Sequence, residues 1–77
     1  MTLDDACAGY AAAHRAHEAA TELAQAASAR LTAERTSDAR DDCGDAWRKA
    51  DRAMRAMWDA RDRLCEAALE RGQGVLL

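Results

Sequence analysis

Alanine recurs every seven residues along both halves of this chain. The positions are Ala6, Ala13, Ala20 and Ala27 in the first half, and Ala39, Ala46, Ala53, Ala60 and Ala67 in the second. A seven-residue spacing keeps one stripe of a helix turned toward one partner, and alanine in that stripe lets two backbones approach closely. The pattern therefore predicts an all-α fold, in which two long antiparallel helices form a helical hairpin with their alanine-rich heptad seams face to face.

Capping residues indicate where the first helix begins and ends. Thr2 can accept hydrogen bonds from the first free amides, and Asp4 and Asp5 place negative charge at the positive end of the helix dipole. No glycine or proline interrupts the segment from residue 10 to 35. We therefore expect a first helix over about 3–35, followed by a turn over about 36–38, where threonine, serine and aspartate cluster.

The second helix is expected over about 38–71. Gly72 should end it as a C-cap and leave a short tail at 72–77, so that the whole chain is one helical-hairpin domain. An alternative places its start at Asp45, after an acidic, glycine-containing segment. We prefer the earlier start because it keeps Ala39 in the seam and gives two helices of matching length.

A second apolar stripe runs along the second helix, outside the alanine seam. Its members are Trp47, Met54, Trp58, Cys65 and Leu69. Tryptophan and methionine are enriched at the centres of protein interfaces, and a hairpin of two helices cannot cover this whole face internally. The stripe is therefore our candidate protein-binding surface. The alternative is that these residues pack only against the hairpin itself.

Large apolar residues are scarce in the rest of the chain. The sequence has 49% hydrophobic residues, but most are alanine, and phenylalanine is absent. Alanine favours helix formation without adding much buried area, and a 77-residue chain buries only about 60% of its unfolded surface. We therefore expect the missing core to come from association, either as a homodimer forming a four-helix bundle or with a protein partner.

The charge balance argues against a general binder of nucleic acid or of anionic membranes. The net charge is −3, whereas both ligands require a positive field. The basic residues of the second helix near its tryptophans are Arg48, Lys49, Arg52, Arg55, Arg61 and Arg63. Acids precede several of them by four residues, which predicts the ion pairs Asp45–Lys49, Asp51–Arg55 and Asp59–Arg63 on a solvated face. A small nucleic-acid-associated protein that uses these arginines remains an alternative.

Cysteine and histidine provide one further alternative. The three cysteines, Cys7, Cys43 and Cys65, form no closely spaced pair, which favours free thiols. Cys7, His14 and His17 share one side of the first helix and could contribute zinc ligands, but a structural zinc site needs four. The hairpin would also bring Cys7 near Cys65. We expect no metal and no cofactor, with a metal- or redox-responsive regulator as the alternative.

The functional hypothesis is a non-enzymatic protein-binding module. Catalysis by a Cys/His pair would need a cleft and a third, orienting group, and a rod of two helices supplies neither. The acidic N-terminus does not resemble a signal peptide, and no apolar run has transmembrane length, so we expect a soluble, cytoplasmic protein. We expect it to dock on a larger protein and to regulate or inhibit that protein.

Overall fold

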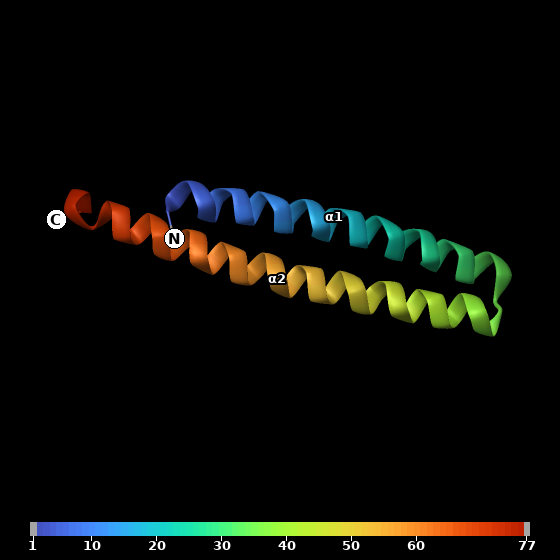
Figure 1. The fold of residues 1–77 in the computed structure, drawn as a ribbon. Helices are drawn as coiled ribbons and strands as arrows, with labels where there is room; N and C mark the ends of the chain where they lie inside the picture. The colour runs from blue at the N-terminus through green and yellow to red at the C-terminus, as the bar shows by residue number, and fades with distance from the viewer. Residues whose placement is uncertain (1, 77) are drawn as a thin grey trace.

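The computed structural model describes the backbone of residues 2–76 and the side chains of residues 2–71. It consists of two helices, α1 (Leu3–Glu34) and α2 (Ser37–Leu76), which run antiparallel and side by side (Figure 1). The resulting rod measures 59 × 17 × 14 Å. The predicted all-α helical hairpin is confirmed.

The first helix begins as its capping residues predict. Thr2 has an extended backbone, with φ −78° and ψ 159°, and its Oγ1 accepts a hydrogen bond from the Asp5 amide at 3.1 Å. Asp4 and Asp5 lie in the first turn, where they complement the positive end of the helix dipole. The helix ends at Glu34, one residue before the predicted end.

The turn between the helices is shorter than predicted and consists of Arg35 and Thr36. Arg35 adopts the left-handed conformation, with φ 53° and ψ 35°, and its amide donates to the Leu31 carbonyl at 2.9 Å. Thr36 then accepts a hydrogen bond from the Ala39 amide at 3.1 Å through its side chain. Thr36 therefore caps α2. The helix starts early enough to keep Ala39 in the seam.

The core is the alanine seam. Among the side chains that the structure describes, the buried ones are Ala6 and Ala24 on α1 and Ala39, Ala50, Ala60 and Ala67 on α2. Ala6, Ala39, Ala60 and Ala67 belong to the predicted heptad series. Ala24 and Ala50 lie four residues after members of those series, on the same face of each helix. The larger residues Tyr10, Leu31 and Leu64, which lie four residues after a seam alanine, are only half-buried. A narrow core of small side chains therefore holds the two helices together.

The C-terminal end of α2 differs from the prediction. The helix continues through Gly72 to Leu76, so it extends past the start of α1 (Figure 1). A glycine inside a helix costs about 1 kcal/mol relative to alanine, which weakens a helix without ending it. No proline follows to stop the helix. Of the predicted tail over 72–77, residue 77 lies outside the described residues.

Candidate protein-binding surface

The five residues of the predicted binding surface form one stripe along α2, in which Met54 is half-buried and the other four are exposed. We call Trp47, Met54, Trp58, Cys65 and Leu69 the apolar stripe. Their spacing alternates between seven and four residues, so the pattern repeats every eleven residues, which is close to three helical turns. The stripe thus runs nearly straight along the helix for about 33 Å at a rise of 1.5 Å per residue.

The apolar stripe moves away from α1 along its length. The alanine seam follows a seven-residue repeat and the stripe an eleven-residue repeat, so the angle between the two increases from turn to turn. Trp47 therefore lies beside the seam, and Leu69 lies on the opposite side of α2. The exposed fractions agree with this arrangement, at 41% for Trp47, 47% for Trp58 and 58% for Leu69. About half of the surface of these side chains is exposed.

Trp47 is tied to α1 by a hydrogen bond. Its Nε1 donates to the Ser28 hydroxyl at 2.8 Å, and the same hydroxyl oxygen lies 3.5 Å from the Cys43 sulfur. Trp58 makes no hydrogen bond to any side chain that the structure describes. Trp47 therefore serves partly to pack the hairpin, as the alternative interpretation of the stripe holds, whereas no such hydrogen bond ties Trp58 to α1.

Charged side chains follow the apolar stripe on the side of α2 opposite the seam. We call Arg48, Arg52, Arg55, Asp59, Asp62 and Glu66 the charge column, and all of them are exposed. Its first three members are basic and its last three are acidic. The ion pairs that involve it within the described residues are Arg48 with Asp45, and Asp62 with Arg61 at 3.6 Å.

The predicted ion pairs along α2 do not form. Asp45 contacts Arg48, three residues on, and not Lys49. Neither Asp51–Arg55 nor Asp59–Arg63 lies within ion-pair distance in the part of the chain with described side chains. Exposed ion pairs of this kind contribute about 0.3–0.5 kcal/mol each to stability, so alternative partners of one charged side chain differ little in energy.

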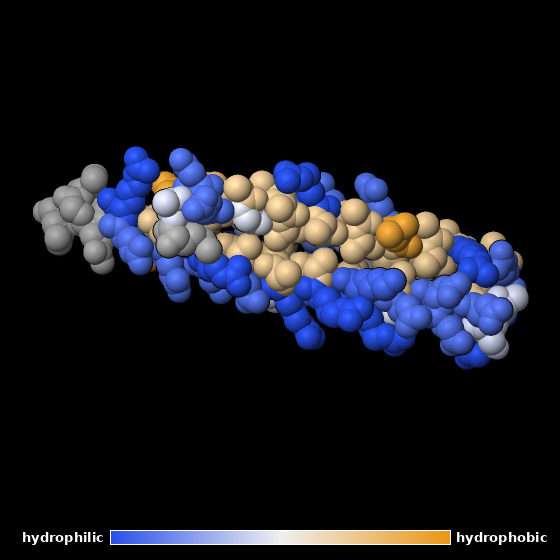
Figure 2. Space-filling model, in the orientation of Figure 1, coloured by the Kyte–Doolittle hydropathy of each residue, from blue (hydrophilic) through white to orange (hydrophobic). Residues whose placement is uncertain are grey.

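A second exposed surface, on α1, was not predicted. Its small residues are Gly9, Ala12, Ala16, Ala19, Ala26 and Ala33, all exposed. Figure 2 shows apolar residues gathered over α1 and hydrophilic residues over α2 on the same side of the rod. Leu23 lies within this surface and is 69% exposed. The signal was present in the sequence as a second series of small residues at heptad spacing.

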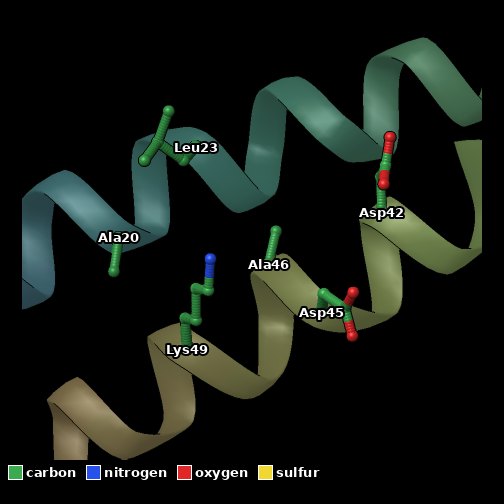
Figure 3. Close-up of a pocket in the computed structure, with 6 residues that line it drawn as sticks. All are labelled: Ala20, Leu23, Asp42, Asp45, Ala46 and Lys49. Atoms are coloured by element: carbon green, nitrogen blue, oxygen red, sulfur yellow. The ribbon is translucent and has the colours of Figure 1, made fainter.

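Leu23 borders a shallow depression between the helices. Figure 3 shows the depression, with Ala20 and Leu23 on one helix and Asp42, Asp45, Ala46 and Lys49 on the other. Three of its six lining residues are charged, and the apolar part of its wall is small. The depression therefore lacks the large apolar lining that is typical of a small-molecule site.

One arginine, Arg30, links the two helices near the turn. Arg30 donates through Nε to Glu34 at 2.8 Å and through Nη1 to Asp42 on α2 at 2.6 Å. These hydrogen bonds raise the pKa of Arg30, with Glu34 as the larger cause. The guanidinium therefore remains charged, and it forms one ion pair within α1 and one with α2.

The histidines and cysteines are not gathered into a site. His14 Nδ1 lies 3.4 Å from the Glu18 carboxylate, and His17 Nε2 lies 3.4 Å from the Thr21 hydroxyl. Cys7, Cys43 and Cys65 are free thiols. Within the described residues, no three His, Cys, Asp or Glu side chains come close enough together to hold a metal ion, and Cys7 does not join the histidines.

Comparison with models of protein families, with curated proteins and with solved structures finds no match to this chain. Over the part of the chain that the structure describes, neither helix has an apolar stretch long enough to cross a bilayer. The structure therefore shows an all-α helical hairpin with an alanine core, and among its described side chains Trp47, Trp58 and Leu69 on α2 are large, apolar and exposed.

Proposed function

We propose that this protein is a non-enzymatic binding module that docks on a larger protein through the apolar stripe of α2. By occupying an apolar groove of that protein, it would regulate or inhibit it. One observation carries the proposal. Two tryptophans, each more than 40% exposed, lie on one face of a helix that the rest of the chain covers only in part.

The spacing of the stripe supports this mode of binding. Helices that dock in grooves present anchors on one face at intervals of three, four or seven residues, and the stripe alternates intervals of seven and four. Tryptophan is also among the residues whose truncation costs most at protein interfaces. Trp58 lies at the centre of the stripe, where hot-spot residues concentrate.

The shape of the molecule supports a binding role over catalysis. Two packed helices give a narrow convex rod, whereas a catalytic site needs groups that converge on a sheltered substrate. The arginines of α2 favour nucleic-acid binding less, because acidic residues interrupt their positive field. Asp45 already neutralises Arg48, and Asp62 contacts Arg61.

The test compares two exposed leucines on opposite faces of the rod. Leu69 belongs to the apolar stripe, and Leu23 belongs to the alanine surface of α1, with exposed fractions of 58% and 69%. Tagged wild type, Trp58→Ala, Leu69→Ala and Leu23→Ala proteins are used to capture partners from the native host. The recovered partner is then purified and titrated against each variant.

We expect Trp58→Ala to weaken partner binding by at least tenfold, because truncating a hot-spot residue costs about 2 kcal/mol or more. Leu69→Ala should weaken it less, and Leu23→Ala should leave it unchanged. Equal binding by wild type and a Trp58→Ala, Leu69→Ala double variant would contradict the proposal. Loss of binding in Leu23→Ala alone would indicate that the interface lies on α1.

A further inference from the structure

Two patterns on α2 share one centre, at Trp58. In the apolar stripe, Trp47 lies eleven residues before Trp58 and Leu69 lies eleven residues after it, so the stripe ends in a large apolar residue on both sides. In the charge column, the sign changes at the same level of the helix. The basic members are Arg48, Arg52 and Arg55, and the acidic members are Asp59, Asp62 and Glu66.

This arrangement is self-complementary when two copies of α2 pair antiparallel. A two-fold axis at Trp58 places each residue before the centre opposite the residue equally far after it on the other copy. Trp58 then meets its own copy, and Trp47 meets Leu69. The same axis keeps the two charge columns on one side of the pair, so basic members face acidic ones.

The positions of the charges fit this pairing closely. Arg55 comes level with the interval between Asp59 and Asp62 of the other copy, and Arg52 with the interval between Asp62 and Glu66. A parallel pair would instead place arginine against arginine and acid against acid, which is unfavourable. Arg52, Arg55, Asp59 and Glu66 form no ion pair with any described residue of their own chain, so their charges remain available.

We propose that a second copy of this chain covers the apolar stripe in the free protein. The two α2 helices pair antiparallel about Trp58, and the two hairpins together form a four-helix assembly. The inference rests on the proposed function, because the same stripe would serve both contacts. A larger partner protein would then have to displace the second copy. Each copy contributes only one helix to the interface, so the interface is small. We therefore expect a dissociation constant in the micromolar range, which allows a partner protein to replace the second copy.

Cross-linking tests the orientation. Asp51 lies seven residues before Trp58 and Cys65 lies seven residues after it, so an antiparallel pair places Asp51 opposite Cys65 of the other copy. In a background with Cys7→Ser and Cys43→Ser, we expect the Asp51→Cys protein to form a disulfide-linked dimer under mild oxidation. The background protein alone should not, because its two Cys65 residues would lie about 21 Å apart along the helix axis.

A matched control separates pairing from random oxidation. Asp45 lies thirteen residues before Trp58, so an antiparallel pair places it opposite Arg71 and not opposite Cys65. Asp45→Cys, in the same background, should therefore give no specific dimer. Rapid cross-linking of the background protein through Cys65 alone would indicate a parallel pair and would overturn the inference. So would equal cross-linking of Asp45→Cys and Asp51→Cys.

Charge reversal tests the complementarity by analytical ultracentrifugation. One variant carries Arg48→Glu, Arg52→Glu and Arg55→Glu, and the other carries Asp59→Arg, Asp62→Arg and Glu66→Arg. We expect each variant to be monomeric at a concentration where the wild type is a dimer, and an equimolar mixture to form a heterodimer. Circular dichroism of each variant checks that the helices remain folded.

The outcomes distinguish this inference from the proposed function. A wild type that stays monomeric at every concentration, yet binds a larger partner through Trp58, would overturn the proposed pairing of two copies and leave the proposed function intact. An equimolar mixture that stays monomeric while the wild type dimerises would also overturn the pairing. A dimer that cross-links at Asp51→Cys, with no partner sensitive to Trp58→Ala, would support the pairing and overturn the proposed function.

Discussion

The two helices share a seam but differ on their outer surfaces. On the seam side both present alanine at heptad positions, and within the described side chains of residues 2–71 the buried ones are all alanines. On the outer side α1 presents a surface of alanine and glycine beside its charged residues, with Leu23 as its large exposed apolar side chain, whereas α2 presents charges and tryptophans. The seam therefore explains why the hairpin forms, and the outer surface of α2 is where a second interface can be built.

The difference follows from what each residue type contributes. Alanine has the highest helix propensity and loses little when it stays exposed, so α1 can remain helical with an alanine surface. A half-exposed tryptophan leaves a large apolar area in water, which becomes favourable only when another surface covers it. The hairpin contact with α2 is therefore sufficient for α1, whereas α2 keeps exposed apolar surface that a further partner can cover.

Overpacking the seam should have the largest effect on stability. Ala24 is fully buried, and Ala24→Leu should lower the free energy of unfolding by about 1–3 kcal/mol, because the added side chain forces the backbones apart. Ala26 lies on the exposed surface of the same helix, so Ala26→Leu should change stability by less than about 0.5 kcal/mol. Urea denaturation measures both. Equal destabilisation would erase the distinction between the two sides of α1.

The two tryptophans should separate hairpin packing from association. Trp47→Ala removes a partly buried ring and its hydrogen bond to Ser28, and we expect a loss of about 1–2 kcal/mol, below the roughly 3–5 kcal/mol of a fully buried ring. Trp58→Ala should cost the isolated hairpin less. Thermal unfolding at low protein concentration compares the two variants. A larger loss for Trp58→Ala would place Trp58 in the hairpin core.

The left-handed residue in the turn offers a stabilising change. Arg35 has a positive φ of 53°, a conformation that costs a residue with a Cβ about 1–2 kcal/mol and glycine almost nothing. After the greater chain entropy of glycine is subtracted, we expect Arg35→Gly to stabilise the hairpin by about 0.5–1 kcal/mol. Arg40→Gly, within α2, should instead destabilise it by about 1 kcal/mol. Differential scanning calorimetry measures both, and a destabilised Arg35→Gly protein would contradict the assigned turn.

Removing the two ion pairs of Arg30 should have the smallest effect on stability. Arg30→Gln removes the charge that holds Glu34 and Asp42, and because all three side chains are exposed, we expect a slight fall in melting temperature that shrinks as salt is added. The pKa of Arg30 is raised in the folded state, so its contribution is present below the unfolded-state pKa and is lost only in strongly alkaline solution. A fall in melting temperature that does not depend on salt would indicate lost packing instead.

Most of the fold was predictable because alanine spacing is a repeated signal. The heptads identified both helices, the seam and the residues of the apolar stripe. Single-residue features were less predictable. Arg35 takes a conformation usual for glycine because packing of the two seams determines where the chain must reverse. Gly72 does not end α2, because one weak helix former cannot stop a helix without further breakers.

The candidate site could be predicted as a set of residues but not as an assembly. The exposure of Trp58 and Leu69 follows from their heptad positions, so the sequence was sufficient for it. The hydrogen bond from Trp47 to Ser28 depends on side-chain reach across the seam, which spacing alone does not specify. The exposure of Leu23 was not predicted, because a single leucine among small residues forms no periodic pattern.

The two-residue turn also has a consequence for how the chain folds. Contacts such as Arg30 with Asp42 and Ser28 with Cys43 join residues close to the turn, so each requires only a short loop to close. Folding can therefore begin at the turn and proceed like a zipper toward the open end, on the microsecond-to-millisecond scale of helical proteins. Opening should follow the reverse path. Backbone amides near Ala39 should exchange with deuterium most slowly, and those near Ala6 most quickly.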